Sequence, residues 1–462
     1  MTDNITPYRD CAQEMTVQGH QSNQFTLSST DDPIPHTVSA FASSEAGGGF
    51  YRKGTTTHKA FTDDLDGVVV SGHICQYGED TTFVITFSDP DGPTLAVQGI
   101  FDGHGNNLLA SHTLCRLYTS AIREKYKNII GYMLSDHYKL RRLLRSISCD
   151  AEMGIGDTVR ITGGSTMTIV FTVESGEDRV VTSMNVGDSS AYMGRIKDGE
   201  SDWRIQMISV DHGVENIDAY AEYYRYVKSL QEEDMKKVEA GEKIKVRRPT
   251  PAVYSRFNCR DEFGRVTNGF PDHNGEYKPI PIYSEVDGEV VVCEETRKYM
   301  RKALYASNSQ GGVQSVRRYI GKDSKGRIVA LPGHDHVNHG STLDGTIQVV
   351  KTHGDLKHKV DHHVTCVPDI NIYRVDPDEM IAIIIGSDGL WDFRWTHEVF
   401  ECVPDDPDAR TASKSISVST GTKASAPIFK TQGYSVTSAG AHGIRSNWDD
   451  VSWTVFLSKK KE

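Results

Sequence analysis

Residues 94–105 read TLAVQGIFDGHG, and this stretch carries most of the information about the fold. Its first eight residues are largely apolar, which is typical of a buried β-strand. An aspartate, two glycines and a histidine follow directly. The carboxylate and the imidazole stand where the strand stops, and glycines allow the backbone to approach a ligand closely. We therefore predict a buried strand at 94–101 that carries functional groups at its C-terminal end.

The same arrangement recurs along the chain. Alternating or continuous apolar residues predict further strands at 167–173, 179–186, 381–385 and 451–457. Beside these strands stand Asp188, Asp388 and Asp449. A single aspartate after a strand is usually a turn residue. If neighbouring strands bring several such ends together, however, their carboxylates repel one another unless cations lie between them. Hard oxygen ligands favour magnesium or manganese over zinc.

The remaining pattern predicts sheets covered by helices. Apolar residues at helical spacing between 114 and 122 predict one helix, and residues 217–235 predict a second. Runs of strands with separate long helices are typical of an α+β fold. Residues 1–60 are polar and lack a sustained hydrophobic period, so we expect a flexible N-terminal extension there. A domain at 61–460 follows, and its irregular stretch at about 241–340 predicts an insertion.

Composition narrows the class of protein. A net charge of -12 argues against a nucleic-acid partner and suits cation binding. Eight separate cysteines without a CxxC pair, no signal segment and no long apolar run predict a soluble, intracellular protein of cytoplasm or nucleus without a membrane partner. Between 334 and 363 seven histidines crowd one stretch without a spacing typical of a zinc site: His334, His336, His339, His353, His358, His362 and His363.

Taken in order, the polar motifs resemble those of the metal-dependent protein phosphatases of the 2C type. They are Glu79-Asp80, FDGHG at 101–105, GST at 164–166, NVGDS at 185–189, Asp211-His212, Gly354-Asp355, SDGLWD at 387–392 and Asp449-Asp450. Each motif is weak alone, and their order is specific. The resemblance covers about 72–456 and implies a four-layer αββα sandwich, two antiparallel sheets flanked by helices, with a large insertion. It also implies hydrolysis of phosphoserine and phosphothreonine on proteins.

The resemblance assigns roles to nine residues. It implies that two magnesium or manganese ions are held by Asp102, Asp388 and Asp449 with the carbonyl of Gly103. Glu79 and Asp80 would hold water on those ions. Asp188 and Asp392, with Asp388, would form a third, weaker metal site. His104 would be the general acid beside Asp102. In this chemistry a metal-activated water attacks phosphorus, and no covalent phosphoenzyme forms.

One departure from the family pattern leaves alternatives open. Cys75 stands four residues before Glu79, where the family places an arginine that grips phosphate. Either another cation substitutes or phosphate binding is weak, so the phosphate-binding residue is unknown. The main alternative is therefore a catalytically weak or inactive member of this fold that binds phosphoproteins or regulates a partner. A nucleotide phosphodiesterase is disfavoured by the acidic charge and the motif order. We expect phosphorylated proteins as partners and a monomer.

Overall fold

The computed structural model describes two N-terminal strands and most of the chain from residue 56 to residue 458. The described ranges are 13–17, 38–45, 56–65, 67–77, 79–105, 109–197, 202–254, 259–260, 266–267, 270–271, 277–278, 280–294, 320–322, 328–330, 341–343, 346–393, 396–403, 411–413, 415–416 and 451–458, with the single residues 200 and 409. Asp449 and Asp450, and the histidines at 334, 336 and 339, lie outside the described residues.

The larger sheet is antiparallel throughout its central path and contains the strand at 94–101. Its order is β1 (Gln13–Val17), β3 (Thr56–Leu65), β4 (Val68–Tyr77), β5 (Asp80–Ser88), β6 (Thr94–Gly105), β8 (Met167–Ser175), β9 (Asp178–Val186) and β24 (Asp369–Val375). The predicted strands at 94–101, 167–173 and 179–186 are confirmed as β6, β8 and β9. β6 runs further than predicted and includes the DGHG residues.

The smaller sheet is also antiparallel. Its order is β11 (Arg204–Met207), β10 (Ser190–Ile196), β25 (Met380–Gly386), β26 (Val451–Ser458) and β2 (Val38–Glu45). The predicted strands at 381–385 and 451–457 are confirmed as β25 and β26, which are neighbours although more than sixty residues separate them in sequence.

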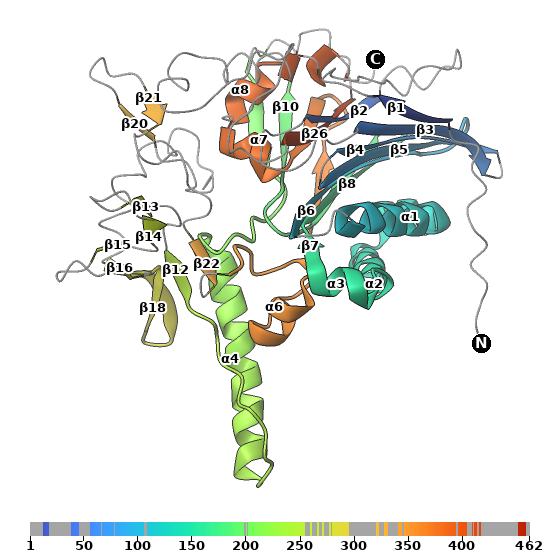
Figure 1. The fold of residues 1–462 in the computed structure, drawn as a ribbon. Coiled ribbons are helices and arrows are strands. Elements are labelled where there is room, and N and C mark those ends of the chain that lie inside the picture. The colour runs from blue at the N-terminus through green and yellow to red at the C-terminus, as the bar shows by residue number, and fades with distance from the viewer. Residues whose placement is uncertain are drawn as a thin grey trace.

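Helices cover the outer face of each sheet, which gives the predicted four-layer αββα sandwich (Figure 1). α1 (Leu109–Ser135) and α2 (His137–Gly154) pack on the larger sheet, and α7 (Asp388–Phe393) and α8 (Thr396–Phe400) on the smaller one. The alternation of side chains along a strand explains the layers. In β5, Phe83 and Ile85 face the helices, whereas Val84 lies between the sheets. No helix among the described residues is long and apolar enough to cross a membrane.

A separate unit lies between β11 and β24. It contains α4 (Ile217–Glu239), β12 (Ala252–Tyr254), β17 (Ile280–Pro281), β22 (Ser341–Leu343) and the hairpin of β18 (Tyr283–Val286) and β19 (Glu289–Val292). Short ladders pair β13 (Cys259–Arg260) with β14 (Val266–Thr267), β15 (Phe270–Pro271) with β16 (Tyr277–Lys278), and β20 (Ile320–Lys322) with β21 (Ile328–Ala330). The unit has its own hydrophobic cluster, which extends from Val214 to Val350 and includes Val364.

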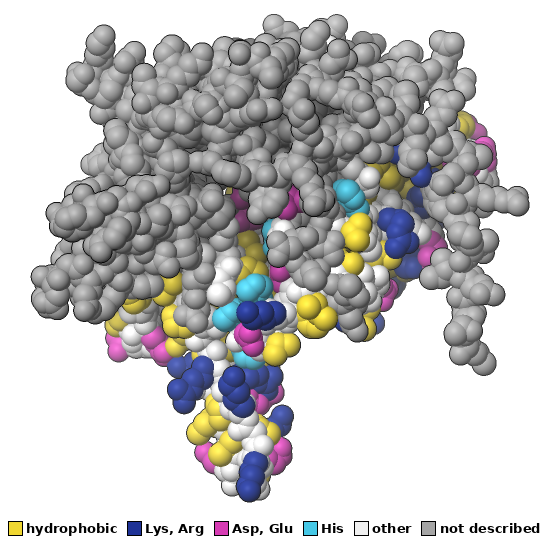
Figure 2. Space-filling model, viewed as in Figure 1, with side chains coloured by type: hydrophobic (Ala, Val, Ile, Leu, Met, Phe, Trp, Pro, Cys, Tyr) yellow, Lys and Arg dark blue, Asp and Glu magenta, His cyan; other side chains and the backbone are white. Residues whose placement is uncertain are grey.

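The position of this unit bears on the predicted insertion. The helix predicted at 217–235 is confirmed as α4, which projects away from the sandwich (Figure 1). Because α4 packs into the unit's own cluster, the unit starts before the predicted 241–340 stretch. Lys, Arg, Asp and Glu alternate with apolar side chains on the projecting part (Figure 2), and Tyr226, Met235 and Val238 are exposed there. Mixed charge of this kind is typical of a solvated helix.

The N-terminal 60 residues contribute strands, which their polar composition did not predict. β1 and the first part of β3 join the larger sheet, and β2 pairs along its whole length with β26 at the edge of the smaller sheet. A strand at a sheet edge needs fewer buried side chains than a central strand, so its hydrophobic pattern is weak. The domain boundary near residue 60 stays a prediction.

A three-stranded ladder at the end of β6 holds the DGHG residues in place. β7 (Gly163–Ser165) pairs on one side with Gly103–Gly105 and on the other with β23 (His353–Gly354). α3 (Asp157–Thr162) and α6 (Leu356–Asp361) flank the ladder. The middle strand leaves no room for side chains at Gly164, because a Cβ atom there would overlap the Asp355 carboxylate and lie 2.5 Å from the carbonyl oxygen of His353.

We predict that Gly164→Ala destabilises the protein. The added methyl group forces the His353–Asp355 backbone away from β7, and overpacking of this kind costs about 1–3 kcal/mol. The control is Gly131→Ala in α1, where a Cβ meets nothing within 4 Å. That change is expected to stabilise the helix by about 1 kcal/mol. Denaturant unfolding of the two variants measures both effects, and equal stability of Gly164→Ala and the parent protein would contradict the tight ladder.

Candidate active site

Two of the predicted carboxylates lie directly opposite each other in the larger sheet. The register of β5 and β6 pairs Asp80 with Asp102. Both are buried, at 1% and 8% exposure. Directly paired residues have Cβ atoms about 4.5–5.5 Å apart on the same face of a sheet. Their side chains share the face of Val84, which packs between the two sheets. Two anionic carboxylates this close are unfavourable without a proton or a cation between them.

The turn before β5 brings Glu79 beside Gly103. The Gly103 N–H donates to the carbonyl oxygen of Glu79 at 3.0 Å, and the Ser111 hydroxyl donates to the same oxygen at 2.5 Å. A Cβ atom at Gly103 would overlap that carbonyl oxygen. Glycine is therefore required for this close approach, and it fixes Glu79 next to Asp102.

The smaller sheet supplies Asp188 and Asp388 at one end. Antiparallel pairing places Ser190 opposite Gly386. Asp188 precedes Ser190 by two residues and Asp388 follows Gly386 by two, so both aspartates extend beyond the same end of this strand pair. Asp388 is the first residue of α7, and both side chains are partly buried.

Two predicted ligands cannot be placed at the side-chain level. Asp392 belongs to α7, one helical turn after Asp388, but its side chain lies outside the described part of the structure. Asp449 lies outside the described residues altogether. Their roles stay predictions.

His104 connects the two groups of carboxylates. Burial lowers the pKa of His104, but the charge and hydrogen bond of Asp355 and the charges of Asp188 and Glu79 raise it, and the net pKa lies above the ordinary value. Thr166 links this strand end to the turn into the smaller sheet, because its N–H donates to the Asp102 carbonyl at 2.8 Å and its hydroxyl lies 2.7 Å from the Ser189 hydroxyl. The segment that carries Glu79, Asp80, Asp102 and His104 therefore lies next to the turn that carries Asp188.

The closest partner of His104 is a residue for which the sequence predicted no role. The His104 Nε2 atom lies 2.5 Å from Oδ2 of Asp355. Asp355 is buried, and although burial raises its pKa, His104 and Thr352 lower it to a net value below the ordinary one. The only signal in the sequence was the Gly354-Asp355 motif. Because 251 residues separate the pair, no local pattern could have joined them.

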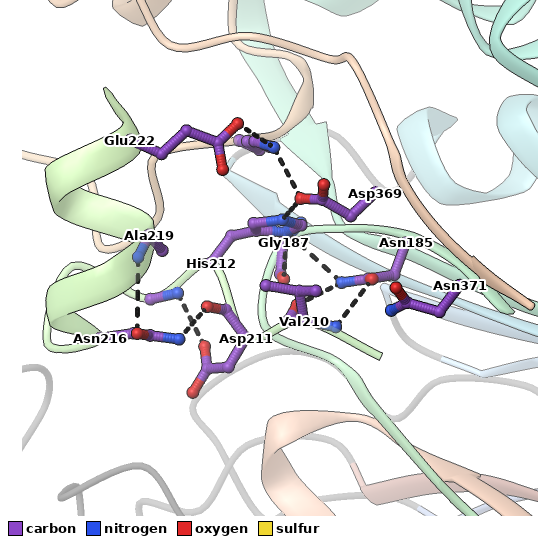
Figure 3. Close-up of polar contacts among 12 residues, drawn as sticks. Asn185, Gly187, Val210, Asp211, His212, Asn216, Ala219, Glu222, Asp369 and Asn371 are labelled. Carbon is purple, nitrogen blue, oxygen red and sulfur yellow. Dashed lines mark hydrogen bonds and ion pairs between the residues drawn. The ribbon is translucent and has the colours of Figure 1, made fainter. Parts of the chain in front are cut away.

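The buried His212 supports the turn that carries Asp188 (Figure 3). The His212 backbone N–H donates to the Gly187 carbonyl at 3.1 Å, and the Gly187 N–H donates to His212 Nδ1 at 3.1 Å. His212 Nε2 lies 2.6 Å from Asp369. An Nε2–H that donates to the carboxylate leaves Nδ1 as the acceptor for Gly187, so these contacts define one tautomer.

The same network reaches the projecting unit (Figure 3). Lys351 Nζ lies 2.7 Å from Asp369 and 3.2 Å from Glu222 of α4. Lys351 is buried, whereas Glu222 is exposed. The Asn216 side chain caps the start of α4 and also donates to the Asp211 carbonyl oxygen at 2.6 Å. α4 is therefore bonded to Asp211 through Asn216 and to Asp369 through Lys351. Asp211 and Asp369 are both neighbours of His212, which supports the Asp188 turn.

The donor set fits hard divalent cations. Glu79, Asp80, Asp102, Asp188 and Asp388 all offer carboxylate oxygens, and magnesium and manganese prefer such ligands. His104 is the only described nitrogen donor that these contacts bring to the group, and Asp355 already binds it. This chemistry matches the predicted ions better than zinc, which favours cysteine and histidine.

The histidine-rich stretch contains a different buried cluster. Glu152, His353 and Cys366 offer ligand atoms within 4.8 Å of one another. The side chains already bond within the protein: His353 Nδ1 lies 3.1 Å from Glu152, and His353 Nε2 lies 3.0 Å from the Tyr118 hydroxyl. Lys359 lies 3.3 Å from Glu152 and balances its charge. These contacts indicate that the cluster is a hydrogen-bonded network that holds β23 in place.

Cys75 does not line an open surface. Its side chain is fully buried, on β4 opposite Thr82 of β5. A phosphate group therefore cannot reach the thiol in this conformation, and the phosphate-binding residue stays unknown. Arg160 of α3 lies three residues before β7, on the segment that leads to the His104 ladder.

Comparisons with known proteins give a likeness of fold only. No family model matches the chain, and no curated protein matches it. Among solved structures, it is similar to the serine-threonine phosphatase 2C of Toxoplasma gondii, with 13% identity, a TM-score of 0.43, and coverage of 87% of this chain and 99% of the other.

Two mycobacterial enzymes give similar values. A PPM Ser-Thr phosphatase from Mycobacterium smegmatis has 12% identity and a TM-score of 0.35, with coverage of 87% and 97%. The serine/threonine phosphatase of Mycobacterium tuberculosis has 12% identity and a TM-score of 0.34, with coverage of 87% and 99%.

The buried histidines predict a loss of stability in mild acid. Burial lowers the pKa of His353, Glu152 raises it and Lys359 lowers it, with a net value below 6.5. Below pH 6.5 the His353 side chain binds a proton in the unfolded chain but stays neutral in the folded protein. The stabilisation is thus complete above that pH and is lost as the pH falls, by up to about 1.4 kcal/mol per pH unit for one histidine.

We expect His353→Gln to show a smaller loss of unfolding free energy than the parent protein between about pH 7 and pH 5.5, because one titrating group is gone. The matched control is His397→Gln, an exposed position on α8, which should keep the parent slope. Denaturant unfolding at several pH values measures this, and parallel curves for His353→Gln and the parent would show that His353 is not buried in its neutral form.

Proposed function

We propose that this chain is a metal-dependent phosphatase that hydrolyses phosphoserine and phosphothreonine on other proteins. The proposal rests on the pairing of Asp80 with Asp102 beside His104 and on the Thr166 contacts that join this strand end to the turn of Asp188. Carboxylates this close need a proton or a cation between them, and cations beside a histidine suit the hydrolysis of a phosphate ester. The ordered motifs that resemble the 2C-type phosphatases support the same reaction.

The proposed ligands of the two magnesium or manganese ions are Asp102, Asp388 and Asp449, with the Gly103 carbonyl. Bound ions of this type supply Lewis acidity, lower the pKa of a water molecule and neutralise phosphoryl oxygens. Glu79 and Asp80 would hold water on those ions. Asp188 and Asp392, with Asp388, would form the third and weaker site.

The protein's own acid–base chemistry depends on His104. With Nε2 facing Asp355, the Nδ1 atom is the one available to a substrate oxygen. The His104 side chain is 36% exposed, so a substrate can approach it. In the proposed reaction the protonated ring donates the Nδ1 proton to the leaving alkoxide of serine or threonine as the P–O bond breaks. Water supplies the new P–O bond, so no covalent phosphoenzyme is needed.

The burial of Cys75 supports a second candidate function. A buried thiol at this position cannot make the bidentate phosphate contact that the family's arginine makes. A folded protein that binds cations yet turns over slowly would act as a phosphoprotein-binding or regulatory member of the same fold. One experiment distinguishes the two candidate functions. Purified protein with manganese should hydrolyse a phosphothreonine peptide if it is a phosphatase, and should do so slowly or not at all if it is a binding or regulatory protein.

The metal prediction is tested by assaying purified protein on an aryl phosphate and a phosphothreonine peptide. Hydrolysis should require added manganese or magnesium and disappear with excess chelator, because carboxylate sites of this kind hold these ions only moderately. Asp102→Asn and Asp388→Asn should each remove nearly all activity. Asp178→Asn, an exposed position at the opposite end of β9 from Asp188, is the control and should leave it unchanged. Full activity in chelator contradicts the proposal.

The role of His104 is tested by the leaving group. His104→Ala is expected to slow phosphothreonine hydrolysis by about 10²–10⁴-fold, because an alkoxide needs a proton when it leaves. Aryl phosphates with good leaving groups need little protonation and should lose much less. Steady-state kinetics on both substrates measures the contrast, and equal losses would refute a general-acid role.

A further inference from the structure

We propose that Asp355 is a positioning residue for His104, built into the fold by a strained backbone and a buried support. This inference rests on the proposed phosphatase function and extends it to a residue outside the predicted metal ligands. Three independent observations carry it: the backbone conformation of Asp355, the space that β7 leaves for its side chain, and the bonds that hold β23 from below.

The backbone at Asp355 is held in an unfavourable conformation. Its φ and ψ angles are 48° and 46°, in the left-handed region that residues with a Cβ atom rarely adopt. Such strain persists only where surrounding contacts enforce it, and it occurs frequently at functional sites. Here the Asp355 N–H donates to the Gly163 carbonyl at 3.0 Å. That bond sets the direction of the side chain.

The side chain enters a space that fits a carboxylate. The Thr352 hydroxyl donates to Asp355 Oδ2 at 2.8 Å, and His104 Nε2 lies 2.5 Å from the same oxygen. Gly164 makes room for this oxygen, because a Cβ atom at that position would overlap it. The carboxylate is 7% exposed, so solvent does not compete for its bond to the imidazole.

A buried network fixes the segment that precedes Asp355. Glu152 of α2 accepts the Gly354 N–H at 3.0 Å and lies 3.1 Å from His353 Nδ1. Lys359 of α6 donates to the Thr352 carbonyl at 2.7 Å and lies 3.3 Å from Glu152. Residues 352–354 are therefore held both by α2 and by α6, the helix that follows Asp355 in the chain.

This arrangement has a chemical consequence for His104. A carboxylate that accepts from Nε2–H holds the ring in one orientation and leaves Nδ1 directed away from Asp355. After Nδ1 gives its proton to the leaving group, the ring keeps the Nε2–H that Asp355 accepts. An amide at residue 355 can still accept that hydrogen bond but carries no charge. A methyl group can do neither.

The test compares Asp355→Asn and Asp355→Ala on substrates that differ in leaving group. We expect Asp355→Ala to lower kcat on a phosphothreonine peptide by about 10–100-fold, typical of a residue that orients a catalytic group. Asp355→Asn should lose less, and both variants should change little on an aryl phosphate with a good leaving group. Combined with His104→Ala, Asp355→Ala should add no further loss, because the two residues act as one unit.

Asp361→Asn is the matched control, an exposed aspartate at the end of α6, and it should behave as the parent protein. Equal losses on all substrates, or an additive double variant, would overturn the positioning role while the phosphatase proposal stands. A parent protein that hydrolyses neither substrate overturns the proposed function and this inference with it. If Asp355→Ala fails to fold, the isosteric Asp355→Asn gives the same comparison, and the ¹⁵N shifts of the His104 ring in that variant show whether its pairing has changed.

Discussion

The main physical constraint on this site is the electrostatic repulsion between its carboxylates, which must be balanced for the fold to hold them close together. Antiparallel pairing places Asp80 opposite Asp102, and both are buried on the face toward the other sheet. Thr166, which bonds to the Asp102 carbonyl and to the Ser189 hydroxyl, joins this pair to the turn that carries Asp188. Buried, closely spaced carboxylates need a proton or a cation to balance them, and carboxylate oxygens suit a hard cation. The hydrophobic layers provide the rigidity that holds this unfavourable arrangement.

Further polar contacts, made by neighbouring segments, support the segments that carry these carboxylates and His104. β7 links the DGHG residues to β23, so the segment that carries Asp355 is continuous with the larger sheet. His212 and Asp369 support the Gly187–Asp188 turn, and Lys351 joins them to Glu222 of α4. The projecting unit is thus bonded both to the turn at Asp188 and, through residues 351–355, to His104. A partner that binds α4 would act on elements that contact the site directly.

The sequence predicted what depends on local patterns. Buried central strands alternate or run apolar, and aspartates at their ends are visible without a structure, which is why β6, β8, β9, β25 and β26 were found. The edge strand β2 (VSAFASSE) lacks that pattern. Asp355 and Asp369 could not be assigned roles, because their partners His104 and His212 are distant in sequence and only tertiary pairing joins them. The packing of α4 against β12 and β22 could not be predicted either, because an amphipathic helix does not show in its sequence which surface it covers.

The central claim is that carboxylates from both sheets form a single cation site. Calorimetric titration of the purified protein with manganese tests it most directly, with Asp102→Asn representing the larger sheet and Asp388→Asn the smaller one. Since both residues are proposed to bind the same ions, each variant should weaken manganese binding in the same titration phase. If either variant binds manganese with the affinity and stoichiometry of the parent protein, the two sheets do not share a metal site.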